Sequence, residues 1–168
     1  PKGDLIFGAR FSDGGAFVER LRVQAGGGIS FNGDTAAANA LDDYEEGTWS
    51  PTLPNGGTIN VGRASYTKVG RLVHVQFQAD ITPTNNSSDF RIGGLPFVTT
   101  STSSSYSVGS LGYTGGLDVS GWQQPLLQHN GNNFFYFHVS TGSTATISNG
   151  FFAGSTRNFV ISASYETN

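Results

Sequence analysis

The stretch RLVHVQFQADI, residues 71–81, alternates apolar and polar side chains from Val73 onward. Successive side chains of a β-strand point to opposite faces, so this pattern predicts a strand with one buried and one solvated face. The expected inward residues are Val73, Val75, Phe77, Ala79 and Ile81, and the expected outward residues are Leu72, His74, Gln76, Gln78 and Asp80.

Two later stretches repeat this alternation. NNFFYFHV, residues 132–139, predicts Phe135, Phe137 and Val139 inward and Phe134, Tyr136 and His138 outward; NFVISASYE, residues 158–166, predicts Phe159, Ile161, Ala163 and Tyr165 inward. Shorter strands are expected in SDFRIGGLPF, SSYSVGSLGY and STATISNGFF, with Gly, Asn and Ser clusters between them. The chain is therefore predicted to be all-β, with an antiparallel β-sandwich of jelly-roll type over residues 48–168.

Residues 1–47 have a different character. GDLIFGARF, AFVERLRVQ and GGISFNGD are short extended pieces joined by SDGG and AGGG. They hold too few apolar residues to bury a core in one chain, so this segment is either disordered or an extended shaft or neck that shares a core with partner chains, as in an intertwined homotrimer. DTAAANAL, residues 34–41, predicts a helix of about two turns, with Asp34 or Thr35 as its N-cap.

Four acids lie together in ALDDYEEGTWSPTL, residues 40–53: Asp42, Asp43, Glu45 and Glu46. Because the alternating pattern begins just after them, we interpret this stretch as a junction between two modules, with EEG as a charged turn. Trp49 and Leu53 are then expected in an entry strand interrupted by prolines. The alternative is a catalytic carboxylate cluster.

The composition excludes several classes of function. Charged residues make up 12% of the chain and the net charge is −3, which gives no electrostatic reason to expect a nucleic acid or an anionic membrane as partner. Apolar runs are too short to span a membrane. Without cysteine there are no disulfides and no thiolate metal sites.

The sequence offers little for catalysis. It contains neither a G-x-S-x-G nucleophile motif nor a Walker A loop. His74, His129 and His138 are scattered, and a polar-face role is expected for those on strands; the alternative is one histidine on a threefold axis, where three copies would hold an ion. A repetitive solenoid typical of depolymerase tailspikes is not visible. We therefore expect no enzyme, no bound metal and no cofactor.

Binding chemistry is better represented. Aromatic faces stack on sugar rings, and amides and carboxylates pair with sugar hydroxyls. LGYTGGLDVSGWQQPLLQHNGNN, residues 111–133, reads as a Gly-rich loop that carries such groups: Tyr113, Asp118, Trp122, Gln123, Gln124, His129 and Asn130. The alternative is that Trp122 closes the end of the sandwich. Outward Phe134 and Tyr136 need cover from a subunit interface or a ligand.

Part of the chain resembles a known family. ERLRVQAGGGISFNGDTAAANALDDYEEGTWSPTL, ASYTKVGRLVHVQFQADI and IGGLPF, between residues 19 and 97, resemble a segment found near the ends of tail-fibre and other virion proteins of bacteriophages. The resemblance implies a homotrimeric tail fibre that acts in the virion, joins other tail proteins and contacts the bacterial surface, with no catalytic residue to transfer.

The expected function is therefore host attachment through a bacterial surface glycan or another receptor. Two alternatives remain at this point. One is a purely structural virion protein, such as a collar fibre or a capsid decoration, and the other is a fragment of a polysaccharide-degrading tailspike.

Overall fold

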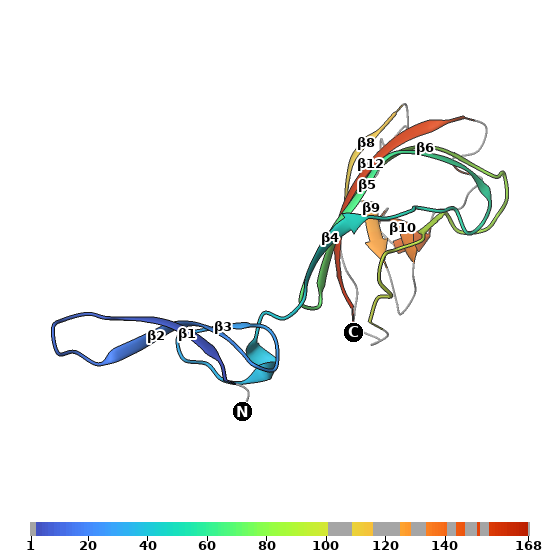
Figure 1. The fold of residues 1–168 in the computed structure, drawn as a ribbon. Helices are drawn as coiled ribbons and strands as arrows, with labels where there is room; N and C mark the ends of the chain where they lie inside the picture. Colours follow the sequence, from blue (N-terminus) through green and yellow to red (C-terminus); the bar gives the residue numbers. More distant parts are fainter. Residues whose placement is uncertain are drawn as a thin grey trace. The chain divides into compact units, whose positions relative to one another are not determined.

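The computed structural model describes residues 3–100, 109–115, 125–128, 134–140, 144–146, 151 and 155–167. The chain separates into two compact units, Pro1–Glu45 and Glu46–Asn168 (Figure 1). The boundary lies within the acidic stretch that we interpreted as a junction. All strand pairs whose register is described are antiparallel, and the fold is all-β as predicted. No helix in this part is long and apolar enough to cross a membrane.

The N-terminal unit is a three-stranded meander. Its strands are β1 (Leu5–Arg10), β2 (Phe17–Val23) and β3 (Ile29–Phe31), in that order. Arg22 on β2 forms ion pairs with Asp4 and Glu19. The Asp4 carboxylate also accepts a hydrogen bond from the Ala25 amide (2.8 Å), and this bond, followed by Arg22, lowers the pKa of Asp4. These polar contacts connect the start of β1 with the end of β2.

The predicted two-turn helix is wrong. Residues 34–41 contain only a single 3₁₀ turn, η1 (Ala37–Asn39). One Asp34 carboxylate oxygen accepts from the Ala36 amide (2.8 Å), and the other accepts from the Asn39 side chain (2.7 Å). Local hydrogen bonds of this kind compete with helical ones, and a segment this short cannot recover the cost of helix nucleation.

The C-terminal unit contains two sheets. The five-stranded sheet has the order β4 (Tyr44–Thr48), β5 (Gly57–Val69), β6 (Leu72–Pro83), β12 (Arg157–Glu166) and β8 (Gly109–Thr114). In the second sheet, β10 (Phe134–Ser140) pairs with β11 (Thr144–Thr146), β7 (Arg91–Gly93) and β9 (Pro125–Gln128). Figure 1 shows β9 and β10 below the curved five-stranded sheet.

The core lies between these sheets, as in a β-sandwich. All five inward residues predicted on β6 are at most 2% exposed, and the four predicted on β12 are at most 3% exposed. Phe135 is buried as predicted and packs edge-to-face on Tyr165, with ring centroids 5.8 Å apart. Phe134 is half-buried. The side chains of Tyr136, Phe137, His138 and Val139 lie outside the described ones.

Two local predictions around the acidic stretch are wrong. EEG is not a turn, because Glu45, Glu46 and Gly47 belong to β4. This strand is at the edge of its sheet, where charged side chains discourage pairing with other chains. The expected entry strand after it is reduced to one bridge between Thr52 and Gly93. Trp49 follows β4 directly and is buried.

Tyr165 predicts how the stability of this unit depends on pH. Its buried hydroxyl donates to the Phe97 carbonyl (3.1 Å), and burial raises the pKa of Tyr165 to about 12. A phenol whose pKa is raised on folding stabilises the fold fully below pH ~10 and loses this contribution as pH rises toward 12, by at most about 2–3 kcal/mol. Urea unfolding between pH 8 and 12 should show this loss. Tyr165→Phe should remove this loss. If the free energy of unfolding of the variant falls with pH as steeply as that of the wild type, the loss does not come from Tyr165.

Candidate functional site

The five-stranded sheet has a polar outer face, which we define by the side chains that point away from the core. The strand register arranges these residues in rows across the sheet. The four rows in the middle of the face are Asn60–Asp80–Asn158, Arg63–Gln78–Val160–Tyr113, Ser65–Gln76–Ser162–Ser110 and Thr67–His74–Ser164. The outward residues predicted on β6 therefore form the middle of this face, beside residues of three other strands.

Some of these side chains bond to one another. Asn158 donates to Asp80 (2.8 Å), which is next to it in the same row. His74 Nδ1 lies 2.9 Å from the Ser164 hydroxyl, and its Nε2 lies 3.4 Å from the Ser162 hydroxyl. These contacts give His74 the polar-face role expected for it. The described residues contain no group of three His, Cys, Asp or Glu side chains that could hold a metal ion.

Two glycine bulges change which residues face outward. On β5, Val61 pairs with the inward residue Ala79, but Arg63 pairs with the outward residue Gln78, so Gly62 is an extra residue. A bulge adds one residue to one strand and reverses the facing of the residues that follow. In a regular strand Arg63 would share the face of Val61. The bulge at Gly62 is therefore what places Arg63 on the outer face.

The second bulge has the same effect on β8. Leu111 pairs with the inward residue Ile161, whereas Tyr113 pairs with the outward residue Val160, which leaves Gly112 as the extra residue. Tyr113 is 58% exposed. The two bulges thus place Arg63 and Tyr113 at the two ends of one row of the outer face.

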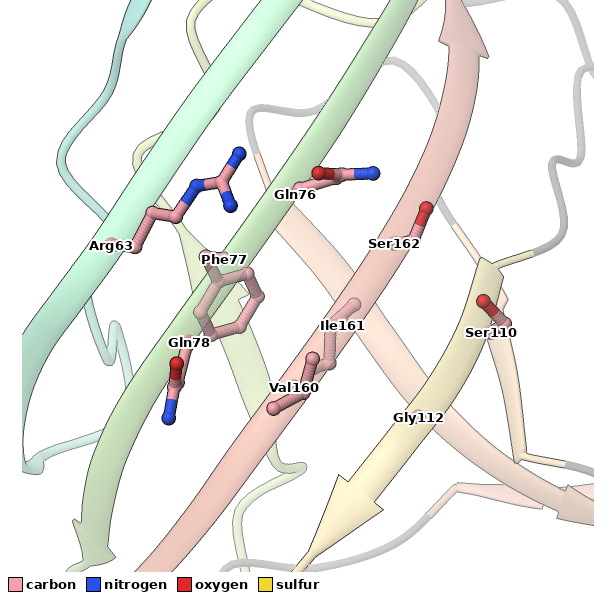
Figure 2. A pocket seen from close by; sticks show the side chains of 9 residues that line it. All are labelled: Arg63, Gln76, Phe77, Gln78, Ser110, Gly112, Val160, Ile161 and Ser162. Atoms are coloured by element: carbon pink, nitrogen blue, oxygen red, sulfur yellow. The ribbon is translucent and has the colours of Figure 1, made fainter.

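A pocket of about 210 Å³ opens on this face (Figure 2). Figure 2 shows Arg63 reaching from β5 and the Gln76 amide directed from β6 toward Ser162 on β12. The lining residues come from four adjacent strands and are Arg63, Gln76, Phe77, Gln78, Ser110, Gly112, Val160, Ile161 and Ser162. A guanidinium, two amides and two hydroxyls therefore surround an apolar patch at Val160.

The predicted binding loop is only partly described by the structure. Tyr113 lies on strand β8, within the strand expected in SSYSVGSLGY, so its assignment to the binding loop is wrong. β9 (Pro125–Gln128) occupies another part of the predicted loop. The glycines around Tyr113 favoured a loop, but Gly112 serves a bulge within a strand. The remaining candidates, Asp118, Trp122, Gln123, Gln124, His129 and Asn130, lie outside the described residues.

Sequence reasoning missed most of the pocket. Gln76 and Gln78 were predicted to point outward but were not assigned a role, and Arg63, Ser110 and Ser162 were not considered. A signal for Arg63 does exist in the sequence of β5. The inward residues are Ile59 and Val61 before Gly62 but Ala64 and Tyr66 after it, and this shift by one residue indicates a bulge.

Comparison with family models, with curated proteins and with solved structures finds no match to this chain.

Proposed function

We propose that this chain is the distal part of a homotrimeric bacteriophage tail fibre, and that it attaches the virion to its bacterial host by binding a cell-surface glycan. In this proposal residues 1–47 form the intertwined shaft or neck, and residues 48–168 form the jelly-roll tip that meets the host. The fibre acts outside the cell and joins other tail proteins of the virion. Its work is adhesion, and it catalyses no reaction.

The observation that carries the proposal is the absence of a core among the described residues of the N-terminal unit. Only Ser30 is buried there. Nine large hydrophobic side chains are between 39% and 73% exposed: Leu5, Ile6, Phe7, Phe11, Phe17, Val23, Phe31, Leu41 and Tyr44. Soluble monomers rarely leave so much apolar surface together, so this surface is best explained by contact with other chains.

The distribution of these residues favours a trimer over a face-to-face dimer. Leu5, Ile6 and Phe7 are consecutive on β1, so they point alternately to the two faces of the sheet, and all three are at least 40% exposed. A dimer formed by stacking two sheets covers only one face of each. In an intertwined trimer each sheet lies between two neighbours, and both faces are covered.

The outer face of the C-terminal unit supports the adhesive part of the proposal. Sugar-binding sites combine polar groups that pair with hydroxyls and an aromatic ring that stacks on the C–H surface of the sugar. The pocket supplies the amides and hydroxyls, and exposed Tyr113 lies beside lining residue Val160 in the strand register.

The proposal is tested by binding of the intact purified chain to host cells and to an array of bacterial polysaccharides. We expect saturable binding to cells and to at least one polysaccharide, without release of sugar fragments. Absence of binding to both would favour a structural virion protein. Release of oligosaccharides from the bound polysaccharide would show a tailspike enzyme instead.

Trp122 remains the predicted stacking residue of the segment beyond Tyr113. Trp122→Ala should weaken binding to cells or glycan by about 1–3 kcal/mol, the loss typical of an aromatic anchor, and leave the melting temperature unchanged. Isothermal titration and thermal melting of the same preparation measure both effects. Unfolding of the variant, with normal binding by the protein that stays folded, would instead assign Trp122 to the core.

A further inference from the structure

We propose that the pocket on the outer face binds a sugar residue that bears a carboxylate, such as a uronic or sialic acid, with Arg63 as the partner of the carboxylate. This inference rests on the proposed function, because it names the class of glycan that the attachment site takes. It concerns residues of the sheet, whereas the loop candidates beyond Tyr113 form a separate prediction.

Arg63 gives the pocket a positive charge. Arg63 is exposed, and among the described residues that line the pocket it is the one that carries a charge. Within the described part of the chain its guanidinium forms no hydrogen bond and no ion pair. Asp80, the acid in the neighbouring row, accepts a hydrogen bond from Asn158. Arg63 therefore keeps its donors available for a ligand, and guanidinium groups bind carboxylates with two parallel hydrogen bonds.

The neutral groups of the pocket match the rest of a sugar. Gln76 and Gln78 offer amide donors and acceptors, and Ser110 and Ser162 offer hydroxyls, which together suit the hydroxyl groups of a pyranose ring. Val160 supplies an apolar contact for the C–H face of the ring. The pocket volume of about 210 Å³ is below the roughly 300–1,000 Å³ of sites for drug-sized ligands, so it fits a single sugar residue.

The bulges at Gly62 and Gly112 determine which side chains lie around the pocket. They turn Arg63 and Tyr113 to the outer face, and both residues lie in the row that includes Gln78 and Val160. A bulge leaves one residue outside the ladder of hydrogen bonds, and bulges commonly re-aim side chains next to functional sites. The two bulges act on the same row, one on each side of the pocket. This coincidence indicates that the sheet is shaped to place Arg63 and Tyr113 on the outer face beside the pocket.

The test compares acidic sugars with a neutral sugar of the same ring. The intact protein is titrated with glucuronic acid, galacturonic acid, N-acetylneuraminic acid and glucose, and binding is followed by NMR. At least one acidic sugar should bind about tenfold or more tightly than glucose, and Arg63→Gln should weaken it by about tenfold to a hundredfold, as expected for a charge-assisted pair. Arg71→Gln is the matched control, because it removes the same charge from an exposed residue in the turn between β5 and β6, outside the pocket.

A second variant tests occupancy of the pocket without changing charge. A side chain added at Gly112 would begin 3.6 Å from the Val160 carbonyl oxygen, an ordinary contact, so Gly112→Val is compatible with the local packing. Because the valine would occupy part of the pocket, it should weaken the acidic sugar at least tenfold while the melting temperature stays within a few degrees.

The outcomes separate the inference from the proposed function. Equal binding of the acidic sugar by the wild type, Arg63→Gln and Gly112→Val would overturn the pocket assignment, even if cells and polysaccharide still bind. Binding of glucose as tight as that of all three acidic sugars would overturn the carboxylate class. If the wild type binds cells but none of the acidic sugars, the inference is wrong and host attachment stands. If it binds neither cells nor polysaccharide, the proposed function itself fails.

Discussion

Trp49→Ala is expected to lower the free energy of unfolding of the C-terminal unit by about 3–5 kcal/mol, the range for removing a large buried aromatic side chain. Trp49 is 7% exposed, and its ring meets Phe77 edge-to-face, with centroids 5.5 Å apart. Phe77 is at the centre of the inward row of β6. The substitution therefore opens a cavity against the buried face of β6.

Urea unfolding followed by circular dichroism measures this effect without relying on tryptophan fluorescence. Trp49→Phe is the control, since it keeps an aromatic ring against Phe77 and loses the long hydrogen bond from the indole nitrogen to the Gln76 carbonyl (3.4 Å). It should cost clearly less than the alanine variant. A loss below about 1 kcal/mol for Trp49→Ala would be typical of a surface substitution and would contradict the assignment to the core.

Phe7→Asp is expected to convert the proposed trimer into monomers. Phe7 is 52% exposed on β1, beside Leu5 and Ile6, which are 58% and 40% exposed. An aspartate buried at this position between chains would lack a partner, and an unpaired buried charge costs several kcal/mol in each of three equivalent places. Light scattering should give three times the chain mass of 17.7 kDa for the wild type and a single chain mass for the variant.

Leu72→Asp is the matched control for the assembly prediction. Leu72 is also 52% exposed, but it lies on β6 in the C-terminal unit, so the same kind of change should leave the trimer intact. A wild-type chain that is monomeric in solution and keeps an ordered N-terminal meander would show that the exposed apolar residues have another purpose. The intertwined fibre would then be wrong.

The strands that pack on the core could be predicted from the sequence because their alternation is regular. On β6 and β12 each inward position is apolar or small, and burial follows this pattern residue by residue. The predictions that were wrong concern segments in which the local sequence preference for a helix or a turn is overridden by the surrounding structure. The alanines of DTAAANAL favour a helix, but the carboxylate of Asp34 bonds within a tighter turn. Similarly, EEG suggests a turn, but an edge strand accommodates charged residues.

The candidate site was harder to predict, because it depends on register. Whether Arg63 and Tyr113 lie on the same face is decided by the pairing of four strands and by one extra residue in each of β5 and β8. Pairing partners such as Gln78 and Val160 are far apart in the sequence, so no local pattern shows that they are neighbours. The change in alternation around Gly62 indicates a bulge, but it does not show what faces the displaced arginine.

The alternation along β6 and β12 has a consequence for how this protein can evolve. Within these strands outward and inward residues alternate, so the residues of the proposed binding face and those of the core are different positions of the same strands. Substitutions at solvent-facing sites usually change stability by no more than about 0.5 kcal/mol. Selection for a new surface ligand can therefore act on positions such as 76, 78 and 162 one mutation at a time, and most intermediates along such a path remain folded.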